Sequence, residues 1–484
     1  MTSVLHARTR LLLAGLALPA LVWGCAVGPD FHRPAPPSVT SYTREPGPAD
    51  LGGGQTLVAG ADIPGQWWTL FQSPALNRLI ERALKNNADL QSTKAALRAA
   101  RETYSAQQGA FFPTLDASYS AQRQQASNTP APPLTSGVNL FTLHTAQLSI
   151  AYTPDIFGGI RRQTETVAAQ AEAQRFETEA AYLTLTSNLA AAAIQEASLR
   201  NQIAATERII ALNREVLALL RRQKAEGQIS GADVAAQEAA LAQAEQGLPP
   251  RQKQLAQQAD LIAALTGRLP SEAPDDGIDL AGLVLPREVP VSLPSKLVEQ
   301  RPDVRVAEAN LHAASAQVGV AIANRLPNFA LTANAGGAAT ELSSLFSHGD
   351  SFWSVTGAVT QPIFQGGALY HRQRAAEAAF EQAKAQYKSA VIDAFQNVAD
   401  TLQALRADAL ALKAADHAEQ SAAASLAIVR KQLEFGGVSN VAVLTAEQGY
   451  RQALIGQAQA QSNRYADTVA LIQALGGGWW NRSD

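Results

Sequence analysis

Sulfur is almost absent from this chain of 484 residues, which contains one cysteine and one methionine. Cys25 therefore has no second cysteine in the chain with which to form a disulfide. The sequence does not support copper or silver as a ligand, because only Met1 and Cys25 carry the soft sulfur that suits these ions. It also lacks a phosphate-binding loop, an HExxH helix and a GxSxG elbow, and its seven histidines are dispersed singly. These absences argue against an enzyme, and we expect neither a cofactor nor a metal.

Charge and hydrophobicity exclude two further classes. The net charge is −3, and the 39 lysines and arginines are scattered along the chain, so we expect no nucleic-acid partner. A transmembrane helix needs roughly 18 apolar residues or more, and no stretch after the N-terminal region is that long. If the chain crosses a membrane, it must do so with strands that close into a barrel, because lipid offers free backbone groups no hydrogen-bonding partner.

The N-terminal region is typical of an export signal. A weakly basic start precedes an apolar run at 11–22, which is too short to span a bilayer but fits the core of a secretory signal. The small residue Gly24 stands directly before Cys25, and this pattern resembles a bacterial lipobox, in which the cysteine becomes the lipid-carrying first residue. We predict a signal peptide at 1–24 and covalent lipid on Cys25. The alternative is an ordinary signal peptide followed by an incidental cysteine.

The two halves of the chain repeat one pattern. "GAFFPTLDASYS" at 109–120 matches "NRLPNFALTANA" at 324–335, and "RRQKAEGQISGADV" at 221–234 matches "RKQLEFGGVSNVAV" at 430–443. Two further pairs occur in the same order, all about 210 residues apart, which predicts two copies of one unit. The predicted division is an N-terminal segment that forms part of a belt at 25–74, repeat 1 at 75–267, an equatorial connection at 268–294, repeat 2 at 295–475 and a C-terminal tail at 476–484.

Each repeat contains a long segment without proline, at about 159–226 and 367–435. Heptad spacing of apolar residues predicts coiled-coil helices, each on the order of 100 Å long. Shorter helices are expected at 75–110, 232–266, 295–326 and 441–475, stacked in pairs to match the length of the long helices. The ends of the chain and the connection would then meet near mid-height. The residues in register are Tyr182, Leu189, Ile203, Ile210 and Leu217 in repeat 1 and Val391, Val398, Leu405, Leu412, Leu426 and Leu433 in repeat 2.

Four segments alternate between apolar and small polar residues, as strands do when their two faces differ. This pattern suits membrane barrel strands with lipid on one face and a lumen on the other. A soluble sandwich would show the same pattern, so the segments alone leave both possibilities open. Four strands cannot close a barrel, for which about eight are needed, so a barrel requires several chains. The segments lie at about 113–126, 140–154, 327–339 and 351–363.

Three motifs carry a family resemblance that covers nearly the whole mature chain: "WWTLFQSPALNRLI" at 67–80, "PDIFGGIRR" at 154–162 and "QRPDVRVAEANLHAA" at 300–314. They resemble motifs of the TolC-like outer membrane efflux proteins, in the NodT-type lipoprotein branch that includes OprM.

The resemblance implies a mainly α fold with a transmembrane β-barrel portion, in which a homotrimer forms a 12-stranded barrel in the outer membrane of a Gram-negative cell and an α-helical tunnel in the periplasm. It implies an exit duct that works with a periplasmic adaptor and an inner-membrane pump, of RND type, to expel drugs or other toxic small molecules. The alternatives are a TolC-type exit duct for protein secretion and a purely structural coiled-coil lipoprotein, which would leave the four strands unexplained.

Two turns, "EGQIS" and "FGGVS", resemble the helix-hairpin tips at which the adaptor docks in this family. Glycines at 227, 436 and 437 are expected to supply the permissive backbone angles of such a turn. The alternative is a helix C-cap without a partner. The residues of the expected docking tips are Gly227, Gln228, Ile229, Ser230, Gly436, Gly437, Val438 and Ser439.

In the same family, acidic and polar residues just beyond the tips form the closed periplasmic constriction. Asp233 falls on one such acidic position, whereas Ala442 and Thr445 stand where the family often has aspartate. We therefore expect the constriction to close partly by packing. The expected constriction residues are Asp233, Val441, Leu444 and Thr445.

Overall fold

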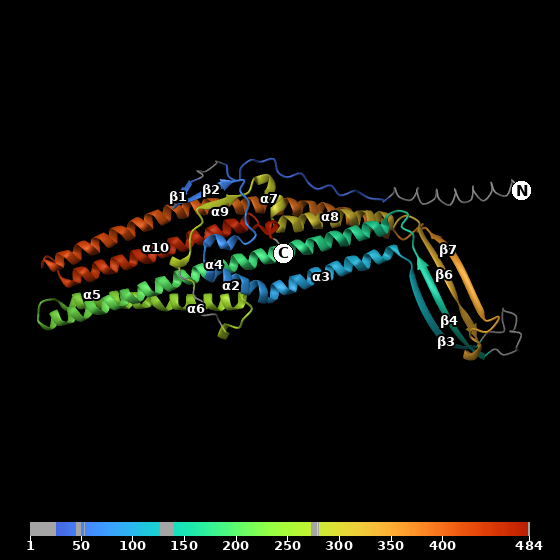
Figure 1. Cartoon of the computed structure of the whole chain (residues 1–484), viewed down its shortest axis with the longest axis horizontal. Helices are drawn as coiled ribbons and strands as arrows, with labels where there is room; N and C mark the ends of the chain where they lie inside the picture. The colour runs from blue at the N-terminus through green and yellow to red at the C-terminus, as the bar shows by residue number, and fades with distance from the viewer. Residues whose placement is uncertain are drawn as a thin grey trace. The chain divides into compact units, whose positions relative to one another are not determined.

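The computed structural model describes residues 26–44, 50–52, 54–125, 140–272, 278 and 280–482 (Figure 1). Cys25 and the predicted signal peptide lie outside the described residues. The chain forms two compact units, each assembled from pieces of both sequence repeats, and we describe each by itself. Unit 1 comprises Met1–Arg33, Arg98–Ala173 and Ala307–Tyr387, and unit 2 comprises Pro34–Leu97, Gln174–Val306 and Lys388–Asp484.

Unit 1 contains a four-stranded antiparallel sheet in the order β3-β4-β6-β7. Each repeat contributes one hairpin, and the repeats join where β4 pairs with β6, with Ile150 opposite Ala333. The four predicted strands are all present, with ends within three residues of those expected. The strands are β3 (Thr114–Gln125), β4 (Leu140–Tyr152), β6 (Asn328–Ala339) and β7 (Ser351–Thr360).

One face of this sheet is apolar and the other is polar, across all four strands. One cross-strand row runs Leu115, Ile150, Ala333 and Val355, and the neighbouring row, on the opposite face, runs Asp116, Ser149, Asn334 and Ser354. Side chains alternate between faces along a strand, so each row represents its face. The apolar face is uncovered in the single chain, with Leu115 66% and Val355 72% exposed.

The two long helices are α4 (Gly159–Ala225) and α9 (Ala368–Glu434), each of 67 residues. Their ends lie within one residue of the predicted ones. The heptad register is confirmed, because Leu189, Val398 and Leu405 are fully buried. In the part of the chain that the structure describes, no helix is both long enough and apolar enough to span a membrane.

Three of the four shorter helices are interrupted, which corrects the prediction of single helices. Asn87 has extended backbone and caps the following helix, its Oδ1 accepting from the Leu90 amide at 2.9 Å. Gly247 stands between two helices just before a pair of prolines, and Arg301 is extended because it precedes Pro302. The pieces are α2 (Pro74–Asn86) and α3 (Ala88–Gln108), α5 (Gly231–Gln246) and α6 (Leu248–Leu265), and α7 (Pro294–Gln300) and α8 (Pro302–Ala323), whereas α10 (Asn440–Ala474) is continuous.

In unit 2, the segment before repeat 1 contacts both the connection between the repeats and the C-terminal segment. β2 (Gln55–Ala59) pairs with β1 (Asp50–Gly52) and, in parallel, with β5 (Glu288–Val291), which gives the belt a small sheet that the sequence did not predict. Trp480 donates its indole N–H to Asp62 Oδ1 at 2.8 Å. Gly478 has a φ of 73°, and a Cβ there would lie 2.5 Å from the Ile63 carbonyl oxygen. Only glycine allows this close approach of the C-terminal segment.

Candidate functional site

The first predicted docking tip is a tight turn from α4 to α5, which both belong to unit 2 here. Gly227 has a φ of 75°. Its amide donates to the Lys224 carbonyl at 3.0 Å, and the Gln228 amide donates to the Gln223 carbonyl at 2.9 Å. These two bonds form the glycine-centred C-cap that satisfies the last free carbonyls of a helix.

The second tip repeats this turn between α9 and α10. Gly436 has a φ of 72°, its amide donates to the Leu433 carbonyl at 2.9 Å, and the Gly437 amide donates to the Gln432 carbonyl at 2.8 Å. The expectation for Gly437 was wrong, because its φ lies outside the left-handed region. In both turns the glycines and the serines are exposed, while Ile229 and Val438 are half-buried. The geometry is that of a C-cap, and adaptor docking stays a prediction.

Asp233 makes local contacts at the first tip. Its carboxylate accepts from the Ser230 amide at 3.0 Å and from the Ser230 hydroxyl at 2.8 Å, while the Asp233 amide donates back to that hydroxyl at 3.4 Å. This is a capping box at the start of α5. The Ser230 hydroxyl and amide together hold the pKa of Asp233 below its usual value. A role in the constriction stays a prediction.

The second tip has no equivalent capping box. Ser439 is the N-cap of α10, but its side chain makes no capping hydrogen bond, and Ala442 occupies the place of the aspartate. Of the expected constriction residues, Val441 and Leu444 are half-buried. Thr445 is exposed and donates its hydroxyl to the Val441 carbonyl of its own helix at 2.9 Å. Packing by these residues also stays a prediction.

A charged cluster that sequence patterns did not predict lies close to the second tip. Glu447 on α10 is only 7% exposed, and its carboxylate lies 3.3 Å from Arg208 of α4, 3.3 Å from Arg430 of α9 and 3.6 Å from Arg451 of its own helix. This carboxylate joins three helices. The spacing of Glu447 and Arg451 predicts a helical pair, but no local signal connects Glu447 to Arg208.

A second group of charged residues, buried or half-buried, lies between α9 and α10, further from the tip. Arg464 is 1% exposed and donates to the Leu405 carbonyl. Asp467 lies within hydrogen-bonding reach of Asp408, whose Oδ2 is buried and has no donor in the structure. Burial, together with the neighbouring Asp408 carboxyl, raises the pKa of Asp467 to about 6.

Two 67-residue helices and a four-stranded sheet with one apolar face are features of an outer membrane channel, and the comparisons with known proteins agree. The sequence model of the family described as outer membrane efflux protein matches residues 79–268 and 293–477, which nearly coincide with the two repeats. The chain belongs to the outer membrane efflux protein family.

Individual relatives match over almost their full length. The chain is 30% identical over 469 residues to the solvent efflux pump outer membrane protein SrpC of Pseudomonas putida, covering 95% of this chain and 96% of SrpC. The solved outer-membrane channel OprN is similar with a TM-score of 0.82 at 27% identity, over 94% of this chain and 100% of OprN. The open state of the MtrE channel of Neisseria gonorrhoeae is similar with a TM-score of 0.80 at 25% identity, over 95% of this chain and 100% of MtrE. This protein is an outer membrane channel of an efflux pump.

Proposed function

We propose that three copies of this chain join their four-stranded sheets into one 12-stranded barrel in the outer membrane, with the apolar face toward lipid. The sheet order carries this proposal: the outer edges of β3 and β7 have no partner strand within the described residues. Unpaired backbone groups cost several kcal/mol each in lipid, so the edges need partners. Four strands are about half of the smallest barrel, and neighbouring copies supply the rest.

The helices would continue the barrel as a periplasmic tunnel through which toxic small molecules leave the cell. The name of SrpC, a solvent efflux pump protein, supports this class of cargo. We propose that a periplasmic adaptor docks at the two exposed tips and links the channel to an inner-membrane pump of RND type. A covalent lipid on Cys25 would add an anchor to the outer membrane. No step in this function calls for a cofactor.

Deletion of the gene tests the proposal, with susceptibility to dyes, detergents, solvents and antibiotics as the measurement. Hypersensitivity that the wild-type gene rescues is the expected result, and it identifies the cargo. Single-channel conductance of the purified protein in a planar bilayer is the companion measurement. A protein that conducts but whose deletion changes no susceptibility would favour protein secretion. A protein that does not conduct would favour a structural lipoprotein and overturn the proposal.

A further inference from the structure

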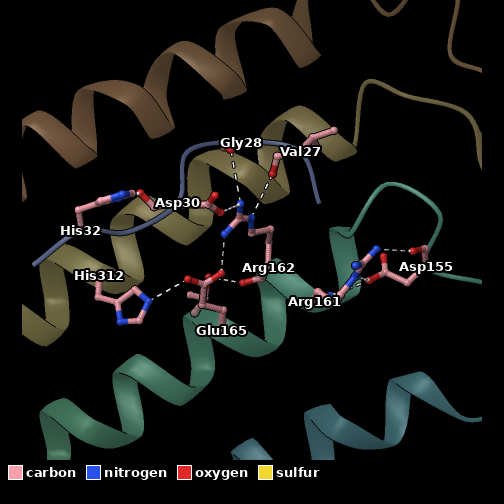
Figure 2. Close-up of polar contacts among 10 residues, drawn as sticks. Val27, Gly28, Asp30, His32, Asp155, Arg161, Arg162, Glu165 and His312 are labelled. Carbon is pink, nitrogen blue, oxygen red and sulfur yellow. Dashed lines mark hydrogen bonds and ion pairs between the residues drawn. The ribbon is translucent and has the colours of Figure 1, made fainter. Parts of the chain in front are cut away.

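The segment that follows Cys25, residues 26–33, is held within unit 1 by one arginine of α4. Figure 2 shows the Arg162 guanidinium facing this segment. Its Nε donates to the Val27 carbonyl at 3.1 Å, and one terminal nitrogen donates to Asp30 Oδ1 at 2.6 Å and to the Gly28 carbonyl at 3.4 Å. The other terminal nitrogen donates to Glu165 Oε2 at 2.8 Å. The Arg162 side chain is only 6% exposed, so its donors depend on these acceptors.

The backbone of the same segment packs without intervening side chains. The Val27 amide donates to the Phe157 carbonyl at 3.0 Å. Gly28 has a φ of 97°, and a Cβ there would lie 2.4 Å from the Gly319 Cα on α8. A Cβ on Gly158 would lie 2.5 Å from Ala26. Because the backbones approach so closely, the segment cannot shift without a steric clash.

Two side chains of the segment extend the contact along α8. The Phe31 ring stacks on the His312 ring, with centroids 4.3 Å apart. Figure 2 shows His312 facing Glu165, and His312 Nε2 lies 2.8 Å from Glu165 Oε1. Arg33 forms an ion pair with Glu308 at 3.0 Å. Glu165 thus connects Arg162 to His312. The contact surface combines α4 of repeat 1 with α8 of repeat 2, so it exists only when the repeats have packed together.

We propose that Arg162 is a positioning residue for the membrane anchor: it fastens residues 26–33 so that the lipid on Cys25 is presented at the junction between β4 and α4. This inference rests on the proposed lipid at Cys25. Phe157 and Gly158, which hold Val27 and Ala26, stand between the end of β4 and the start of α4. If the segment were free, each released residue would lengthen the reach of the lipid by about 3.5 Å. The fastened segment instead keeps Ala26, the residue that follows Cys25, against Gly158 at the end of the sheet.

The test compares full-length variants purified from the outer membrane. Arg162→Gln removes the charge and most of the donors. Asp30→Ala breaks the same contact from the segment, and the Asp30 side chain is 79% exposed, so this change leaves the packed helices intact. Arg161→Gln is the matched control, because Arg161 adjoins Arg162 but pairs with Asp155 at 3.1 Å. Hydrogen exchange of residues 26–33 should become about tenfold faster or more in Arg162→Gln, less so in Asp30→Ala, and stay unchanged in the control.

Two further measurements separate this inference from the lipid proposal. Mass spectrometry of the wild-type N-terminus decides whether Cys25 carries lipid, and an unmodified N-terminus overturns the lipid proposal and this inference with it. The yield of assembled oligomer in the outer membrane decides positioning. Arg162→Gln should lower the yield in the lipidated protein. In a Cys25→Ser background, adding Arg162→Gln should not lower the yield below that of Cys25→Ser alone. With lipid present, unchanged exchange in both variants, or an unchanged yield despite faster exchange, overturns the positioning role alone.

Discussion

The two helical hairpins of unit 2 share one backbone turn, but they place their charges differently. In the hairpin of α4 and α5, Arg214 pairs with Glu245 at 2.6 Å and Arg221 with Glu238 at 2.7 Å, and all four side chains are at least 43% exposed. In the hairpin of α9 and α10, the Glu447 carboxylate is buried under three arginines, and Asp408, Arg464 and Asp467 cluster between the helices. Exposed ion pairs contribute little to stability, whereas a broken buried pair costs several kcal/mol.

The two repeats therefore share the backbone geometry of the turn but differ in the charged contacts that stabilise it. The first hairpin is secured at its end by a local capping box, which depends on residues three apart in sequence. The second has no such box and is secured by long-range charge contacts that reach α4. We therefore expect the loss of an ion-paired side chain to be mild in the first hairpin and severe in the second.

The largest effect is expected for Glu447→Ala. It leaves Arg208, Arg430 and Arg451 without their shared carboxylate. Because these arginines are between 33% and 56% exposed, solvent offsets part of the loss. We expect a destabilisation of about 2–3 kcal/mol, at the lower end of the cost of breaking a buried pair. Thermal unfolding of the detergent-solubilised protein measures it, with Glu245→Ala as the control. Equal effects of the two substitutions would remove the contrast between the hairpins.

Gly227→Ala and Gly436→Ala test whether two turns of the same geometry also have the same cost in stability when the glycine is replaced. Both glycines are left-handed, and a Cβ on either meets nothing within 4 Å, so the cost is backbone strain alone. We expect about 1–2 kcal/mol in each case. Gly437→Ala should cost less, because its φ is outside the left-handed region. Thermal unfolding again serves as the measurement, and a large difference between the first two variants would contradict the shared geometry.

Removing the capping box from the first hairpin and adding one to the second tests the same comparison. Asp233→Ala should cost about 1 kcal/mol, because the Ser230 amide loses its acceptor. Ala442→Asp should give the second hairpin a box with Ser439 and stabilise it by about 0.5–1 kcal/mol. Thermal midpoints of both variants report these changes. If Asp233→Ala also leaves drug susceptibility and channel conductance unchanged, Asp233 has no part in the constriction.

The expected effect of Asp467→Asn depends on pH. The folded chain raises the pKa of Asp467 from 3.8 to about 6, so the folded state binds a proton more tightly than the unfolded state does. Stability is therefore lost as pH rises from about 4 to about 6, and the penalty persists above this window.

Removal of the ionisable carboxyl should relieve this penalty, by about 1 kcal/mol at pH 7.5 after allowance for solvent screening. The gain should vanish near pH 4. Thermal unfolding at both pH values measures it, with the exposed Asp393→Asn as control. A gain of equal size at both pH values would show that ionisation of Asp467 does not cause the penalty.

Local patterns in the sequence were sufficient for the long helices and for the four strands of unit 1. The limits of the proline-free segments placed the ends of α4 and α9 within one residue, and alternation placed the ends of the four strands within three. Periodicity failed at Asn87, Gly247 and Arg301, because an apolar register continues across a one-residue interruption while the backbone does not. The glycine at each tip was also found, because a turn between two long helices needs a left-handed residue.

Only the tertiary structure decided which charges are buried and which segments they join. Glu447 reaches Arg208 across 239 residues of sequence, Glu165 reaches His312 across 147, and Arg162 holds Val27 across 135. Sequence by itself determined the repeat, the coiled-coil register and the strand faces, because each follows from the spacing of neighbouring residues. Contacts between distant residues depend instead on how the helices pack, and burial, which gives those charges their energetic weight, exists only after packing.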